Sequence, residues 1–220
     1  RSASTLYDFN RDNSNPPMRP FGQLPDDATI ARTAAALTAN GITAHVAADG
    51  AAALAKLQEL LPAGVPVMTM TSATLDTIGA AATINESGRY ASLRVKLSAM
   101  DRKSQGPQMQ QLGAAPEWAV GSVHAVTEDG RVQVASATGS QLPAYAYGSS
   151  HVIWVVGAQK IVPNLEMGMR RIAEHVFPLE DARALKAYGV HSGLNKVLTL
   201  NREATPGRLA MILVKEKLGF

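Results

Sequence analysis

The sequence predicts an α/β protein with a mostly parallel sheet covered by helices. Strand-like apolar segments alternate with helical segments along much of the chain, which is typical of parallel sheets. The stretch His151–Gly157 is almost continuously apolar, as expected of a central strand that is buried on both faces. Hydrophobic residues make up 46% of the 220 residues and charged residues 18%, so the chain has enough apolar material for a packed core.

Residues 1–25 are predicted to form an irregular arm, because proline and asparagine interrupt them repeatedly. Residues 26–220 are predicted to form one domain, since neither a repeat nor a linker divides them. Its first helix begins at the capping pair Asp26-Asp27 and ends at Asn40-Gly41. The next elements, by their hydrophobic spacing, are a strand at 42–46, a helix at 50–61, a buried strand at 65–70, a short helix at 74–79 and a helix that ends before Gly106-Pro107.

The second half has clearer boundaries. Asp129-Gly130 lies between apolar stretches, which predicts a β-hairpin. The stretch 118–126 before it is interpreted as a passage from helix to strand, and residues 131–136 as the second arm. Beyond the hairpin we expect a short helix opened by Pro143, the central strand 151–157, a helix from Pro163 through about His175 that packs through Leu165, Met169 and Ile172, and strands around Leu198–Leu200 and Leu209–Val214.

The composition excludes several kinds of chemistry. The chain has no cysteine, so it forms no disulfide, offers no thiol nucleophile and supplies no thiolate for an iron–sulfur cluster. The histidines lack metal-binding spacing, so no metal site and no tightly bound cofactor is predicted. No apolar run reaches about 18 residues, so no membrane span is expected. The absence of cysteine also fits the cytoplasm, which is the predicted location.

Charge is distributed unevenly along the chain. Residues 1–88 hold five Lys/Arg against eight Asp/Glu, and residues 89–220 hold sixteen against ten, so the balance changes from −3 to +6. The basic C-terminal portion suits a small anionic metabolite, although an ordinary solvated surface explains it equally well. No basic run is interleaved with aromatic residues, so nucleic acid is not an expected partner.

Three loops have residues suited to holding an anion, since ligands of α/β sheets bind where strands lead into helices. Small and hydroxyl-bearing residues let the backbone and side chains approach a phosphate or carboxylate. The same residue types also cap helices and close turns, and that alternative stays open for each loop. The candidate anion-binding residues are Thr71, Ser72 and Thr74 in the first loop, Thr138, Gly139, Ser140 and Gln141 in the second, and Ser192, Asn195 and Lys196 in the third.

Two residues are candidates for acid–base or nucleophilic chemistry. Glu86, flanked by Asn85, Ser87 and Arg89, has the right type for a nucleophile or general base, and Arg89 is a further candidate anion ligand. His191 has the right type for a proton shuttle near neutral pH. A surface turn explains Glu86 as well, and a hydrogen-bonded loop residue explains His191.

Five segments together resemble the lactate-utilisation (LUD) domain family. These segments are INESGRY at 84–90, GSVHAVTEDGRV at 121–132, ATGSQLPAYAYGSSHVIWVVGAQKIV at 137–162, PLEDARALKAYGVHSGLNK at 178–196 and PGRLAMILVKEKLGF at 206–220. The resemblance implies a three-layer fold with a mixed, mostly parallel sheet, similar to the sugar-phosphate isomerase and coenzyme A transferase superfamily. It also implies iron–sulfur and oxidoreductase partner proteins that oxidise lactate to pyruvate.

The resemblance and the loops lead to two functional hypotheses. The first is an accessory subunit in lactate or organic-acid oxidation, without a cluster of its own because the chain has no cysteine. The alternative is a stand-alone enzyme or sensor that binds a phosphorylated, acyl-coenzyme A or nucleotide metabolite. Neither the reaction nor the oligomeric state, monomer or homo-oligomer, follows from the residues.

Overall fold

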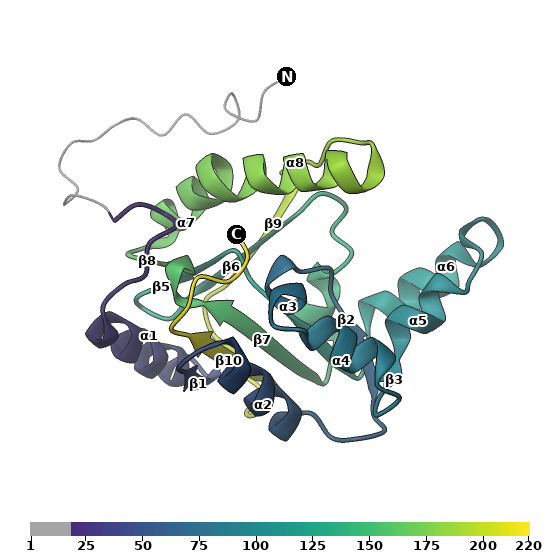
Figure 1. Ribbon diagram of the computed structural model, residues 1–220, viewed down its shortest axis with the longest axis horizontal. Coiled ribbons are helices and arrows are strands. Elements are labelled where there is room, and N and C mark those ends of the chain that lie inside the picture. Colours follow the sequence, from purple (N-terminus) through teal and green to yellow (C-terminus); the bar gives the residue numbers. More distant parts are fainter. Residues whose placement is uncertain (1–18) are drawn as a thin grey trace.

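The computed structural model describes residues 19–220, so most of the expected N-terminal arm lies outside the described residues. Its centre is a six-stranded sheet with the order β1-β10-β7-β4-β2-β3, in which all neighbouring strands run parallel (Figure 1). Its strands are β1 (Thr43–Ala47), β2 (Pro66–Thr69), β3 (Ala91–Ser92), β4 (Trp118–Gly121), β7 (His151–Gly157) and β10 (Leu209–Val214). The predicted central strand is confirmed, because β7 lies between β10 and β4.

A second sheet of four strands has the order β8-β5-β6-β9. Its strands are β5 (Ala125–Thr127), β6 (Val132–Ser136), β8 (Ile161–Val162) and β9 (Lys196–Leu200). The predicted hairpin at Asp129-Gly130 is confirmed, since β5 and β6 pair in antiparallel orientation across that turn. Strands β5 and β8 pair in parallel, whereas β6 and β9 are antiparallel.

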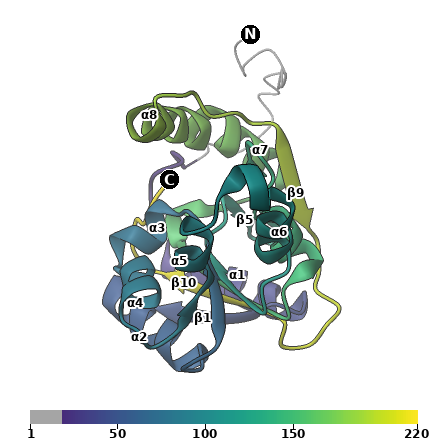
Figure 2. The same ribbon diagram turned by 90° about the vertical axis from the view of Figure 1, so that its right-hand side faces the viewer.

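Side chains of β7 alternate between the two faces of the large sheet, and a different layer covers each face. Ile153 and Val155 face a core formed with helices α2, α3 and α4, whereas Val152, Trp154 and Val156 face a core shared with α1 and the second sheet. Figure 2 shows these layers from the side. The expectation of an α/β fold with helices flanking a mostly parallel sheet is confirmed.

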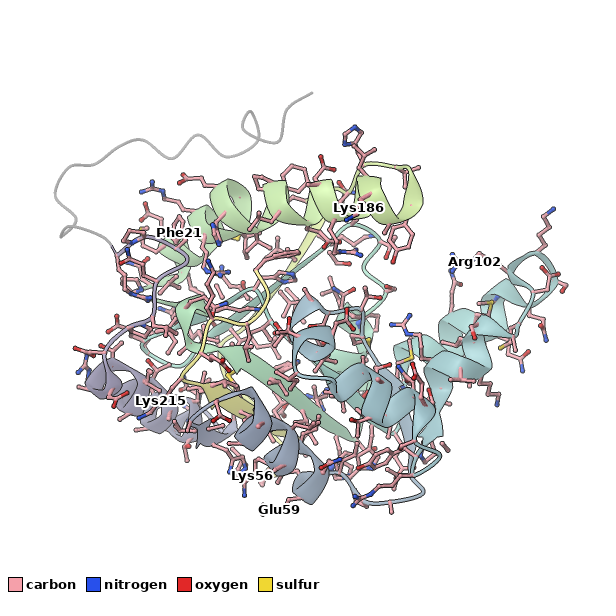
Figure 3. All side chains as sticks on the ribbon, in the orientation of Figure 1. Phe21, Lys56, Glu59, Arg102, Lys186 and Lys215 are labelled. Carbon is pink, nitrogen blue, oxygen red and sulfur yellow. The ribbon has the colours of Figure 1, made fainter. Side chains whose placement is uncertain are left out.

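The helices around these sheets begin at side-chain caps in most cases. They are α1 (Asp27–Ala39), α2 (Gly50–Leu60), α3 (Ala73–Thr77), α4 (Ala80–Glu86), α5 (Leu93–Ser98), α6 (Arg102–Ala114), α7 (Leu165–Arg171) and α8 (Phe177–Tyr188). A π-helical turn, Ile172–Val176, joins α7 to α8. Helices α5 and α6 project from the body, and the side chain of Arg102 lies on this arm (Figure 3). Within residues 19–220, no helix is long and apolar enough to cross a membrane.

Two expectations about local structure are wrong, one is right only in part, and one helix was not expected. Gly106-Pro107 does not end a helix but lies inside α6, whose first turn is capped by the Asp101 carboxylate. Residues 118–126 hold two strands and no helix, because a short apolar run buried on both sides has no diagnostic period. The helix 177–188 was missed. Of the expected packing residues Leu165, Met169 and Ile172, Ile172 is buried and the other two are half-buried; the buried residues of α7 itself are Met167, Gly168 and Arg171.

Candidate functional site

Two neighbouring strands of the large sheet continue into the second sheet at the same place. Strand β4 leads into β5 through Ser122–His124, and β7 leads into β8 through the 3₁₀ turn Ala158–Lys160. Because β4 pairs with β7 and β5 pairs with β8, the two linkers lie side by side at the carboxyl ends of the strands. Ligands of parallel α/β sheets bind at this edge, so these linkers are the natural place to look for a site.

Lys160 is the central side chain of these linkers. It is 3% exposed, and its Nζ lies 3.0 Å from Thr74 Oγ1, 3.1 Å from Ser122 Oγ and 3.2 Å from the carbonyl oxygen of Val123. All three partners are neutral, and no ion pair of the described chain includes this lysine. The fold therefore buries an ammonium group without a compensating carboxylate, an arrangement that is costly.

Arg171 adds a second buried cation. Its side chain is fully buried on the inner face of α7, and its Nη1 donates to the carbonyl oxygen of His124, next in sequence to the acceptor of Lys160. Its Nε and Nη2 atoms have no hydrogen-bond partner among residues 19–220. Since buried polar groups are nearly always paired, two unpartnered donors on one guanidinium make Arg171 a candidate for binding an acceptor from outside the described residues.

A second buried arginine shows what a purely structural role looks like in this protein. Arg208 is 7% exposed, and it donates to the carbonyl oxygens of Ser149, Ala144 and Tyr145 and to Glu203 Oε2 at 2.6 Å. All three of its nitrogens are used, and its charge is paired with a carboxylate. Arg171 differs on both counts.

The two unpartnered donors of Arg171, Nε and Nη2, have the geometry that carboxylates prefer. The Nε and Nη2 donors of an arginine form a fork that matches the two oxygens of a carboxylate. Two surface arginines use the same pair of atoms here. Arg170 holds Glu174 at 3.0 and 3.3 Å, and Arg183 holds Glu180 at 2.7 Å through both nitrogens.

Burial and mutual repulsion change the proton affinities of the cluster. Burial, with a smaller contribution from the neighbouring Arg171 cation, lowers the pKa of Lys160 to about 7. Burial likewise lowers the pKa of Arg171, although a guanidinium remains charged at neutral pH. Burial and then the Lys160 cation lower the pKa of His124 to about 3, so this imidazole is neutral and its Nδ1 accepts from the Ala135 amide at 3.0 Å.

The segment that follows β10 lies against the same cluster. Thr74 Oγ1 donates to the carbonyl oxygen of Leu218 at 3.2 Å, and Gln159 Nε2 donates to the same oxygen at 2.8 Å. Ser122 and His124 are only half-buried, so the cluster reaches solvent along the linker between β4 and β5. We call Thr74, Ser122, Lys160 and Arg171 the cationic cluster.

The first predicted loop contributes one residue to the cationic cluster. Thr74 binds Lys160, as described above. Ser72 caps α3 through a bond from the Leu75 amide, so its side chain serves the alternative role of a helix cap. Thr71 is exposed, and its Oγ1 lies 3.4 Å from Nη2 of Arg94, whose guanidinium also donates to the Thr69 carbonyl oxygen.

The second and third predicted loops meet each other but contribute nothing to the cluster. Lys196 Nζ donates to the carbonyl oxygen of Thr138 at 2.6 Å, and Asn195 donates to that of Ala137 at 3.1 Å. Within the second loop, side-chain bonds close the turn through Ser136, Thr138, Gly139, Ser140 and Gln141. Their role as anion ligands stays a prediction.

The predicted acid–base candidates lie apart from the cluster's contacts. Glu86 is exposed at the end of α4, and Arg89 is exposed with its guanidinium 5.5 Å from the ring centre of Tyr90. His191 is exposed, and its Nδ1 lies 2.9 Å from an oxygen of Asp181, which also accepts from the Ser192 amide. The contacts of His191 are those of a hydrogen-bonded loop residue, whereas Glu86 ends a helix instead of forming a turn. A chemical role of either residue stays a prediction.

Sequence reasoning missed Lys160, Ser122 and Arg171, although a signal existed for two of them. Lys160 is the one charged residue within the apolar stretch 152–162, and Arg171 lies four residues after the buried Met167 on the same helix face. A charge that interrupts an apolar pattern marks a buried polar site. Ser122 carries no such signal, because its role depends on a contact 38 residues away.

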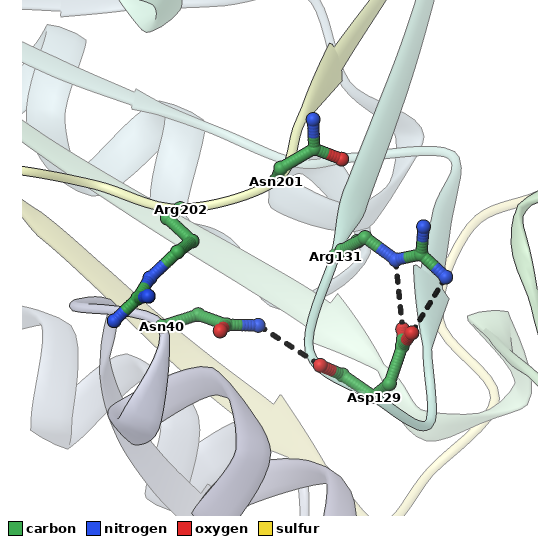
Figure 4. Close-up of a pocket in the computed structure, with 5 residues that line it drawn as sticks. All are labelled: Asn40, Asp129, Arg131, Asn201 and Arg202. Carbon is green, nitrogen blue, oxygen red and sulfur yellow. Dashed lines mark hydrogen bonds and ion pairs between the residues drawn. The ribbon is translucent and has the colours of Figure 1, made fainter.

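Two hollows are lined by residues outside the cationic cluster. One is a surface depression of about 510 Å³ lined by Asn40, Asp129, Arg131, Asn201 and Arg202 (Figure 4). Asn40 donates to the Asp129 carbonyl oxygen and Arg131 binds its carboxylate, so three of these residues satisfy one another. The other, of about 220 Å³, is lined in part by His45, Trp118 and His151. In the described part of the chain, no three acidic or histidine side chains come together as a metal site.

The fold and the cationic cluster define an α/β protein whose parallel strands present buried positive charge at their carboxyl ends. The family model described as the LUD domain matches residues 30–214. The chain therefore belongs to the LUD domain family and is a lactate-utilisation-type domain.

A solved structure supports the fold independently. The crystal structure of a DUF162 family protein from Deinococcus radiodurans aligns with 87% of this chain and 99% of that chain, with a TM-score of 0.52 and 13% identity. At that identity the likeness concerns the fold alone. The search of curated proteins found no match.

Proposed function

We propose that this chain is an accessory subunit in the oxidation of lactate or a similar organic acid, and that it binds a small carboxylate at Lys160 and Arg171. Membership of the LUD family supports the metabolic context. The observation that carries the site is the buried Arg171 fork, whose Nε and Nη2 have no partner among the described residues. An incoming carboxylate would satisfy both donors and compensate two buried positive charges.

The chain's own residues limit what it contributes to an oxidation. Iron–sulfur clusters are held mainly by cysteine thiolates, and this sequence has none. The electrons would therefore pass through iron–sulfur and oxidoreductase partners, while this subunit binds and orients the acid. The segment Lys215–Phe220 packs against Thr74 and Gln159, so binding is expected to displace it.

Ligand-induced stabilisation tests the carboxylate site directly. Lactate, pyruvate and inorganic phosphate are added in turn to the purified chain while its unfolding temperature is measured. A ligand at 100 times its dissociation constant adds about 2.7 kcal/mol of stability. The shift is expected with lactate or pyruvate, lost in Arg171→Met, and kept in Arg202→Met, which removes an exposed arginine. A shift that survives Arg171→Met would show that the ligand binds elsewhere.

Growth on lactate tests the proposed metabolic role. A deletion strain is expected to lose growth on lactate and to regain it with the wild-type gene but not with the Arg171→Met variant. Normal growth of the deletion strain would contradict the accessory role.

The same two cations also suit a phosphate group, which supports the second candidate function. A stand-alone enzyme or sensor for a phosphorylated, acyl-coenzyme A or nucleotide metabolite would use Lys160 as a point charge and Arg171 as a fork. In the stabilisation assay this alternative predicts a shift with inorganic phosphate or coenzyme A and none with lactate.

A further inference from the structure

Ser122 contacts the buried amine of Lys160. Its Oγ lies 3.1 Å from Lys160 Nζ and has no other hydrogen bond among the described residues. The serine is half-buried at the carboxyl end of β4, so its hydroxyl lies next to the amine and still near solvent.

Two hydrogen bonds of Lys160 leave one of the three N–H positions on its Nζ free, and they fix where that position points. Thr74 Oγ1 donates its own proton to the carbonyl oxygen of Leu218, so it accepts from Lys160. The carbonyl oxygen of Val123 has no proton and must also accept. Two N–H groups of Lys160 are therefore committed, and the remaining position faces Ser122. When the amine is neutral, that position holds its lone pair.

We propose that Ser122 is a nucleophile activated by Lys160, and that the pair transfers the acyl group of an ester or thioester that carries a carboxylate. This activity goes beyond binding an organic acid. The choice of a carboxylate-bearing substrate rests on the proposed Arg171 fork, whereas the Ser122–Lys160 pair does not depend on it. A serine nucleophile with a lysine as its general base is a known variant of the Ser-His-Asp catalytic triad.

The chemistry requires no cofactor. Lys160 takes the proton of Ser122 while Oγ bonds to the acyl carbon, and the bond to the leaving oxygen or sulfur breaks. Lys160 then gives its proton to the leaving group, which departs as an alcohol or thiol. Water attacks the acyl-serine and passes a proton to Lys160, and the Oγ–carbon bond breaks. Ser122 recovers the proton and a carboxylic acid is released, with no net oxidation.

The electrostatics of the cluster suit a base that works at neutral pH. Burial beside Arg171 lowers the pKa of Lys160 to about 7, so a large part of the amine is neutral there. General bases are most effective when their pKa lies near the working pH. Arg171 Nη1 donates to the carbonyl oxygen of His124, so this guanidinium would hold the substrate's carboxylate near the linker that carries Ser122.

Covalent labelling of the full chain tests the nucleophile. Phenylmethanesulfonyl fluoride and p-nitrophenyl acetate, which transfers a smaller group, are reacted with the protein, and the modified residue is identified by peptide mass spectrometry. Ser122 is expected to react with at least one reagent faster than Ser140, an exposed serine bonded only to Thr138. Its rate should rise with pH and level off above about 7. If Ser122 reacts no faster than Ser140 with either reagent, the proposal is wrong.

Variants test the role of the lysine. Lys160→Met is expected to lower the labelling rate of Ser122 by at least about 100-fold, as for loss of a general base. Lys196→Met, which removes an exposed lysine bonded to Thr138, should leave that rate unchanged. An unchanged rate in Lys160→Met would overturn the proposal.

Thr74→Val provides a second test of Lys160 if Lys160→Met does not fold: the pH midpoint of Ser122 labelling is compared with that of the wild type. Loss of one acceptor destabilises the ammonium form, so the pH midpoint of labelling should move to lower pH. An unmoved midpoint would also overturn the role of Lys160. Lactate stabilisation is measured separately on the wild type, so failure of the carboxylate site and failure of the nucleophile are distinguishable.

Discussion

Replacement of Lys160 by methionine separates the electrostatic cost of the buried amine from its other interactions. Methionine keeps the length of the side chain and removes its charge and its three hydrogen bonds. The lost bonds lower stability by a similar amount at every pH, whereas the cost of the buried charge varies with pH. The pH dependence of the difference between the wild type and the variant therefore isolates the charge.

The direction and size of that dependence follow from linkage. The pKa of Lys160 falls from the usual 10.5 to about 7 in the folded protein, so between these values the unfolded chain binds more protons. The wild type must therefore gain stability relative to Lys160→Met as the pH rises through this window. Each tenfold change in proton affinity is worth about 1.4 kcal/mol, so the gain between about pH 6 and pH 9 is about 2 to 3 kcal/mol.

Urea unfolding followed by tryptophan fluorescence is a suitable assay, because Trp154 is fully buried between the two sheets. Below about pH 8 the groups that face Lys160 do not titrate: His124 is already neutral, and Arg171, whose pKa burial lowers to about 9, is still charged. Lys103→Met, at an exposed lysine that forms no ion pair in the described chain, is the control and should show a flat difference. Parallel pH profiles of the wild type and Lys160→Met would refute the reasoning.

Three further results are expected. Arg208→Met should lower the free energy of unfolding by about 3 to 5 kcal/mol, because it leaves Glu203 and three carbonyl oxygens without their donor. In the same urea titration, Arg171→Met should lower the free energy of unfolding clearly less, because two of its donors have no partner to lose. Equal losses would contradict the contrast between the two arginines. Gly130→Ala should cost at least about 2 kcal/mol by calorimetry, because its φ is +82° and a Cβ would lie 2.5 Å from Ala36, whereas Gly64→Ala, with φ of +78° and open space, should cost only about 1 kcal/mol. Glu86→Gln and His191→Ala should leave the lactate-induced shift in unfolding temperature unchanged, since both side chains are exposed and neither contacts the cluster; a lost shift would restore them as site residues.

The sequence predicted elements well where a local pattern decides the structure. The run His151–Gly157 could only be a buried strand, and Asp129-Gly130 supplies the left-handed residue that its turn needs. Prediction failed where tertiary contacts decide. Residues 118–127 became two strands because both sides are buried. The error at α6 is of another kind, because this helix has no buried residue; it starts at its local cap Asp101 and continues through Pro107.

The candidate site was less predictable than the fold for a related reason. Its residues come from the linkers after β4 and β7, from α3 and from α7, and only Thr74 belonged to a loop chosen from the sequence. The loops that looked richest in polar residues bind each other, as Lys196 and Thr138 do. Composition is enough to predict that a segment is a loop. Whether its polar groups are free to bind a ligand depends on which other loops the fold brings into contact with it.

The topology explains why this place requires polar side chains but not why it requires two cations. Where β4 and β7 leave one sheet for the other, the linker carbonyl groups lose strand partners and need donors, and Lys160 and Arg171 supply them at Val123 and His124. Neutral donors such as asparagine or glutamine would meet that need without burying charge. Arg208 shows that this fold pairs a buried cation with a carboxylate when its role is structural. Lys160 can relieve its cost by losing a proton, because its pKa is lowered to about 7, whereas the Arg171 guanidinium stays charged at neutral pH. The unpaired charge of Arg171 therefore favours an anionic ligand over a structural role.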